Sequence, residues 1–120
     1  MKSYRFLLFS LTIIASTFSL YSQVIPVVND EDKLLYLFEK CEKIRATNPD
    51  SAVIYAQHAL DIANSVNKEY SIVKAEHLLG YCYYSRNDFE LAITHLNKSL
   101  QIARQSNLDE WIALGLNRTG

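Results

Sequence analysis

The sequence predicts an all-α fold in which antiparallel helical hairpins stack side by side. Only three Gly and two Pro occur in 120 residues, which is too few for a turn-rich β fold. The apolar residues recur at the three- and four-residue spacing of a helix, and segments match one another after a shift of about 40 residues. Because a single hairpin cannot bury its apolar face, this repetition favours stacked hairpins.

Charge and composition exclude two classes of protein. Twelve Lys and Arg residues against 13 Asp and Glu residues give a net charge of −1, so the chain lacks the dense basic surface that binds phosphates. We therefore expect no nucleic-acid partner. An apolar fraction of 49% is too high for a disordered tail, and 120 residues suffice for one domain at most.

Residues 1–22 are predicted to form a secretory signal peptide. Lys2 and Arg5 give it a positive start, and the apolar run over residues 6–18 is shorter than the roughly 20 residues of a membrane-spanning helix. Cleavage is expected after Ser22, with Ser19 as the alternative. The protein is then exported, to the periplasm or outside the cell, and would contact a membrane only through an uncleaved leader or a helix downstream.

The first predicted hairpin spans residues 30–67, after an extended leader over residues 23–29. Its first helix has an apolar stripe that consists of Leu34, Leu37, Phe38, Cys41 and Ile44. Asn48 is a suitable N-cap and Pro49 suits the first helical position, so the second helix should begin there. The packing side of this second helix is predicted to be Ala52, Ala56, Ala59, Leu60 and Ala63.

The second predicted hairpin spans residues 70–106, and Asp88 is expected to cap its second helix. That helix repeats the first hairpin, since Ala52 aligns with Ala92 and Leu60 with Leu100. A third unit begins at residue 109 and the sequence ends inside it, at residue 120. Such arrays need about three units for stability, so we expect the chain to be the N-terminal piece of a longer protein.

The second hairpin resembles a tetratricopeptide repeat, through the residues Leu79, Gly80, Tyr83, Phe89, Ala92, Leu96 and Ser99. The resemblance implies an α-solenoid in which these residues pack the repeats. Gly80 would let two helices approach closely, the small Ala92 and Ser99 would admit the neighbouring helix, and Tyr83 and Phe89 would fill the bend. The sequence departs from the pattern at Glu76, where a Trp-like residue is usual.

Enzyme motifs are not found in the sequence. It has no Gly-rich phosphate loop, no Ser nucleophile elbow and no pair of His residues four apart on one helix. His58, His77 and His95 fall on three different predicted helices. We therefore expect no catalysis, no metal site and no cofactor.

The resemblance implies that the first helix of each repeat lines a groove that binds a protein or peptide. On the second hairpin the residues expected to face this groove are Lys74, His77, Tyr81, Tyr84 and Ser85. Aromatic rings beside an ammonium and an imidazole suit a peptide ligand. The alternative for Tyr81 and Tyr84 is packing against the neighbouring hairpin.

The order of leader, spacer and repeats, with a helix that opens on Pro49-Asp50-Ser51, is similar to the exported sensory region of bacterial sensor histidine kinases and related regulators. This similarity implies the N-terminal sensory part of a longer signalling protein. The alternative is a free periplasmic or secreted adaptor without an output domain.

The two cysteines, Cys41 and Cys82, could pair in an oxidising compartment. Both fall among apolar residues at helical spacing, and a buried Cys usually acts as a small apolar side chain. The pattern therefore favours buried thiols over a disulfide.

Overall fold

A computed structural model describes residues 28–119, and all regular secondary structure within this range is helical. The helices are α2 (Asp30–Ile44), α3 (Pro49–Ser65), α4 (Glu69–Ser85), α5 (Phe89–Gln105) and α6 (Asp109–Thr119). The all-α prediction is confirmed. The predicted signal peptide and most of the leader lie outside the described residues. Within those residues, no helix combines the length and the apolar character that crossing a bilayer requires.

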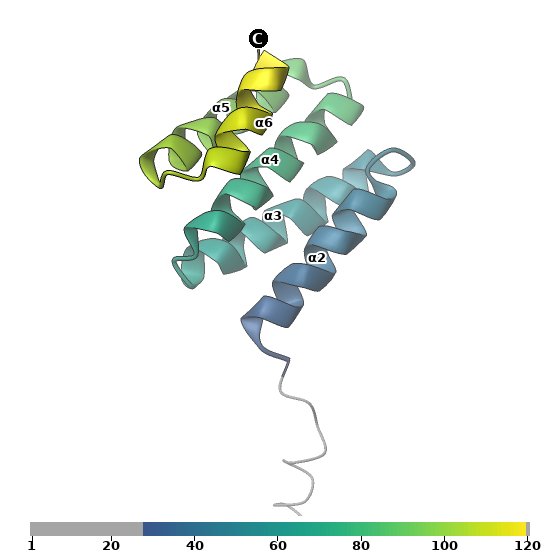
Figure 1. The fold of residues 1–120 in the computed structure, drawn as a ribbon. Coiled ribbons are helices and arrows are strands. Elements are labelled where there is room, and N and C mark those ends of the chain that lie inside the picture. The colour runs from purple at the N-terminus through teal and green to yellow at the C-terminus, as the bar shows by residue number, and fades with distance from the viewer. Residues whose placement is uncertain (1–27, 120) are drawn as a thin grey trace, which may run out of the picture.

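Successive helices run antiparallel and stack as hairpins (Figure 1). Helices α2, α4 and α6 lie side by side in one layer, and α3 and α5 form the layer behind them. Helix α4 therefore has neighbours in both layers, and aromatic contacts join it to α6.

Helix α3 packs through small side chains. Its buried residues are Ala52, Ala56, Ala59, Leu60 and Ala63, as the sequence predicts. Larger side chains from the neighbouring helices fill the same core, among them Leu37 and Phe38 from α2 and Leu79 from α4. Because alanine projects little beyond the backbone, the large side chains of α2 and α4 can close over α3 without leaving voids.

Helices α4 and α5 make their closest approach at Gly80. A Cβ atom placed on Gly80 would lie 2.6 Å from Cγ of Leu96 and 3.2 Å from the carbonyl oxygen of Ala92. These distances leave no room for a side chain unless Leu96 moves. Further along the same contact, the Ser99 hydroxyl donates a hydrogen bond of 3.0 Å to the Val73 carbonyl oxygen.

Three asparagines set the length of the helices. Asn67, Asn87 and Asn107 have positive φ angles of 54°, 67° and 55°, and each lies two residues after the last residue of a helix. After each, the next N–H donates back to the helix, as in the 2.9 Å bond from Asp88 N to Tyr83 O. This Schellman geometry satisfies free carbonyls, and Asn tolerates the left-handed conformation better than other residues that carry a side chain.

Because these turns recur, helices α3 to α6 begin 20 residues apart. The shift of about 40 residues seen in the sequence is therefore two helical steps of equal length. Only the full period was recognised from the sequence, although Asn87 falls midway between Asn67 and Asn107.

Two sequence expectations about the bend before α5 are wrong. Asp88 stands at the N-cap position but its side chain makes no capping hydrogen bond, because its carboxylate pairs with Arg86 Nε at 3.2 Å. Phe89 does not fill the bend. It is the first residue of α5, where its side chain is 51% exposed and its ring packs edge-on against that of Tyr84. Tyr83 is half-buried and stacks on the ring of His95.

Candidate functional site

A pocket of about 310 Å³ lies between α2, α4 and α6, the three helices of the front layer in Figure 1. The residues that line it are Glu42, Arg45, Lys74, His77, Leu78, Tyr81, Trp111 and Leu114. We call it the aromatic pocket. Its volume is at the lower end of the range for ligand pockets, which suits one or two side chains of a partner.

A row of four aromatic rings runs along the aromatic pocket, and three of them, His77, Tyr81 and Trp111, line it. The ring of Trp111 meets those of Tyr70 and His77 edge-on, at centroid distances of 5.8 and 5.0 Å. The His77 ring meets that of Tyr81 in the same way at 4.6 Å. Edge-to-face pairs at these distances are favourable, so the row is held in place without a ligand.

Two cations stand at the rim of the aromatic pocket. The Arg45 guanidinium lies 4.9 Å from the Tyr81 ring centroid, and the Lys74 ammonium lies 4.9 Å from that of Phe38. Glu42 is the one carboxylate in the lining, and its Oε1 is 3.7 Å from Lys74 Nζ. The side chains that line the pocket therefore carry a net positive charge, although the whole chain has a net charge of −1.

The structure brings together three of the five residues predicted to face the groove. Lys74, His77 and Tyr81 line the aromatic pocket. Tyr84 and Ser85 do not, because they occupy the last turn of α4, beyond the pocket. Tyr84 is 61% exposed and packs against Phe89 of α5.

The residues that other helices contribute to the pocket were not predicted from the sequence. Arg45 and Glu42 come from the end of the α2 region, and Trp111 and Leu114 come from α6. The resemblance implied that the first helix of each repeat lines the groove, but individual residues were named only on the helix that is α4. The periodicity could have pointed to α2 and α6, because they are the neighbours of α4 in the same layer.

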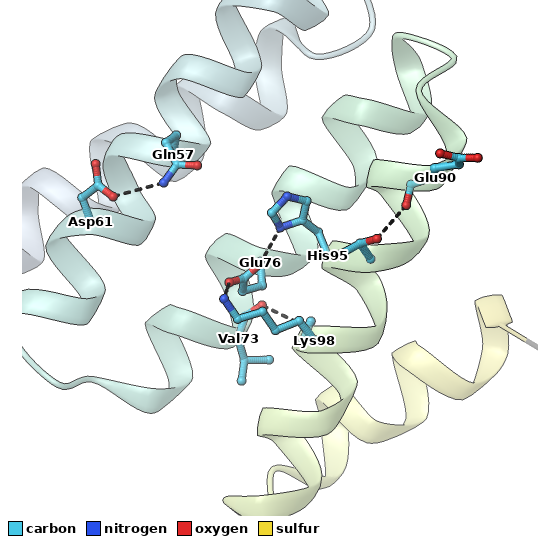
Figure 2. A network of polar contacts seen from close by, with 9 residues as sticks. Gln57, Asp61, Val73, Glu76, Glu90, His95 and Lys98 are labelled. Carbon is cyan, nitrogen blue, oxygen red and sulfur yellow. Dashed lines mark hydrogen bonds and ion pairs between the residues drawn. The ribbon is translucent and has the colours of Figure 1, made fainter.

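A buried carboxylate occupies another face of α4 (Figure 2). The Glu76 side chain is completely buried, with Oε2 2.7 Å from His95 Nδ1 and Oε1 2.8 Å from Lys98 Nζ. The Lys98 contact is an ion pair without hydrogen-bond geometry. Both partners belong to α5, so the cluster joins the two helices of the second hairpin.

The environment of Glu76 keeps it charged. Burial alone would raise the pKa of this carboxyl group, but the His95 hydrogen bond and the Lys98 ammonium outweigh burial, and the pKa is lowered from its ordinary value of 4.5. A buried carboxylate that is stabilised by a hydrogen bond and a nearby ammonium group suits a structural ion pair. It gives no sign of a general acid or base, which would need a pKa nearer neutrality.

Within residues 28–119, no three His, Cys, Asp or Glu side chains gather as a metal site would require. His58 is exposed on α3, whereas His77 belongs to the aromatic pocket and His95 contacts Glu76. Nothing in this part of the chain indicates catalytic chemistry.

Comparisons with known proteins point to one family. A family model described as tetratricopeptide repeat matches residues 43–105. Tetratricopeptide repeat protein 29 of Trypanosoma brucei brucei is 31% identical over 68 residues, which is 57% of this chain and 14% of that protein. The chain thus spans about a seventh of the length of the curated relative it matches. No solved structure matches the chain.

The Glu76 cluster predicts how stability depends on pH. The pKa of Glu76 is lower in the fold than its ordinary value of 4.5, so its contribution is complete above that value and is lost as the pH falls through the folded pKa. Glu76→Gln should lower the free energy of unfolding by about 1–3 kcal/mol at neutral pH. The difference from wild type should shrink between about pH 5 and about pH 3.

Urea denaturation monitored by circular dichroism at several pH values measures this difference. Glu39→Gln is the matched control, because Glu39 is exposed on α2 and its substitution should change stability little at any pH. A Glu76→Gln penalty that stays constant down to pH 3 would contradict the assigned role of the carboxylate.

Proposed function

The chain belongs to the tetratricopeptide repeat family, and we propose that it is a protein-interaction module whose aromatic pocket binds a peptide segment that carries a carboxylate. Repeats of this family generally mediate protein–protein interactions. The proposal that the ligand carries a carboxylate rests on the aromatic row and on the two cations, Arg45 and Lys74, at the rim of the pocket.

The aromatic row would supply most of the affinity. Aromatic residues are enriched among the few residues that dominate the energy of protein interfaces, because they bury large areas at a small cost in side-chain entropy. His77 and Trp111 are already buried, whereas Tyr81 is half-exposed at the pocket. A partner side chain would therefore contact the exposed part of Tyr81 first.

The rim would select the charge of the partner. The planar guanidinium of Arg45 can donate two hydrogen bonds to one carboxylate, and Lys74 adds a second cation. Lys74 is only partly neutralised, since its contact with Glu42 is 3.7 Å long and the Glu42 side chain is 51% exposed. An Asp or Glu side chain, or a chain terminus, would thus be favoured over a basic segment.

Selection from a random peptide library displayed on phage tests this proposal. Peptides enriched on the immobilised chain should contain an acidic residue beside an apolar one. For such a peptide, Arg45→Ala and Tyr81→Ala should each weaken binding about tenfold or more in fluorescence anisotropy. Raising the salt concentration should also weaken binding, because the selecting charges are partly exposed.

Two control variants separate the aromatic pocket from the rest of the surface. Tyr84→Ala removes an exposed tyrosine of the same helix outside the pocket, and Arg104→Ala removes an exposed arginine of α5. Both should bind the selected peptide as wild type does. Equal losses for Tyr81→Ala and Tyr84→Ala, or a library selection that enriches no acidic peptides, would contradict the proposal.

We also propose that the protein is exported. The support is the sequence of residues 1–22, with its positive start and short apolar run. Intact-mass measurement of protein recovered from an exporting bacterial host should show the loss of the first 19 to 22 residues. A full-length mass would instead favour an uncleaved leader.

For the whole protein, we propose the N-terminal sensory part of a bacterial signalling protein, with a free periplasmic or secreted adaptor as the alternative. The support is the order of leader, spacer and repeats. The coding sequence beyond Gly120 distinguishes the two. A membrane helix followed by a kinase or DNA-binding domain favours the first, and further repeats followed by a stop codon favour the second.

A further inference from the structure

The two cysteines of the chain are in contact across two helices. Cys41 lies on α2 and Cys82 on α4, and their sulfur atoms are 3.3 Å apart. Both side chains are completely buried, and both are free thiols. The sequence expectation of buried thiols is confirmed. The sequence did not show that the fold places these two thiols in contact.

The separation of the two sulfur atoms is not far from that of a disulfide. A disulfide holds its sulfur atoms about 2.05 Å apart, so the thiols need to approach by only about 1.25 Å. Rotation about the Cα–Cβ bonds and small shifts of α2 can supply such a movement. Helix α2 is the first helix of the described array and has no neighbour on its outer side there, so it can adjust more easily than α4.

We propose that Cys41 and Cys82 form a redox site in which an intramolecular disulfide joins α2 to α4. The oxidant is a small disulfide such as glutathione disulfide. The Cys82 thiolate attacks one of its sulfur atoms, which forms a mixed disulfide and releases one glutathione thiolate. The Cys41 thiolate then attacks the Cys82 sulfur and releases the second glutathione. Two electrons leave the protein thiols, and their two protons end on the two glutathione molecules.

The surroundings favour Cys82 as the first nucleophile. The hydrogen bond from the Cys41 thiol lowers the pKa of Cys82 against the opposing effect of burial, and the nearby Arg45 guanidinium lowers it further. The same pair raises the pKa of Cys41, because the hydrogen bond to Cys82 and burial both favour its protonated form. The thiolate is the reactive species in exchange, so this asymmetry sets the order of the two steps.

The crosslink would tie together two walls of the aromatic pocket. Cys41 precedes Glu42 in α2 and Cys82 follows Tyr81 in α4, and both of these neighbours line the pocket. The two cysteines are 41 residues apart in the chain, so the bond would enclose all of α3. The proposal does not depend on the pocket having a ligand.

Refolding in a glutathione buffer tests the proposal and avoids the barrier that burial imposes on the folded protein. The reduced, denatured whole chain is refolded with glutathione disulfide in excess, and remaining thiols are then alkylated in denaturant. The expected product is a monomer two hydrogens lighter than the reduced chain, without alkyl or glutathione groups. Digestion should yield a Cys41–Cys82 linked peptide, and the Tm should exceed that of the reduced chain by about 10 °C or more.

Single variants show whether the gain comes from the crosslink. Cys41→Ser and Cys82→Ser should each keep one thiol or one glutathione adduct, and neither should gain in Tm on oxidation. A second arm treats the folded wild-type chain with the same buffer and should yield the same linked product more slowly.

Three outcomes of the wild-type refolding arm would overturn the proposal: glutathione adducts on both cysteines, disulfide-linked dimers as the main product, or two thiols that remain free. A linked product with an unchanged or lower Tm would also overturn it, since the bond would then require a distorted fold. Because these results come from the wild-type chain, they do not depend on the folding of any variant.

Discussion

The contact between α4 and α5 at Gly80 is the constraint on which the array depends. With no side chain at this position, Leu96 can lie against the α4 backbone, and the two helices come close enough for the Ser99 hydroxyl to bond the Val73 carbonyl. The alanine stripe of α3 follows the same rule in the first hairpin. Small side chains on one helix thus pack against large side chains on the next and fix the spacing of the helices. The aromatic pocket, the Glu76 cluster and the cysteine pair all depend on that spacing.

Helix α4 carries three kinds of chemistry on different faces. Glu76 points toward α5 and forms a buried ion cluster, whereas the next residue, His77, belongs to the aromatic pocket beside α6. Cys82 faces α2 and meets Cys41. This division follows from helix geometry, since consecutive residues lie about 100° apart around the axis. A central helix with neighbours on several sides can therefore hold the hairpin together and still present a binding surface.

The spacing of apolar residues along the sequence predicted most of the fold. The features that it did not predict depend on contacts between residues far apart in the chain. The apolar stripes gave the packing sides of α2 and α3 correctly, because spacing along one helix decides which residues share a face. Spacing could not show that Tyr84 packs against Phe89 instead of lining the pocket, since that contact joins two different helices. It also could not reveal that Cys41 meets Cys82, or that Lys98 and His95 from another helix compensate Glu76. The 20-residue step was within reach of the sequence, because Asn87 falls midway between Asn67 and Asn107.

A double-mutant cycle on Gly80 and Leu96, measured by chemical denaturation, tests the close contact most directly. Gly80→Ala should lower the free energy of unfolding by about 1–3 kcal/mol, although alanine is the better helix former by about 1 kcal/mol. In a Leu96→Ala background the contacts with the leucine side chain are gone and only the Ala92 carbonyl oxygen remains close, so this loss should fall by at least half. If Gly80→Ala stabilises the chain, or costs the same in both backgrounds, then α4 and α5 do not meet in the way described.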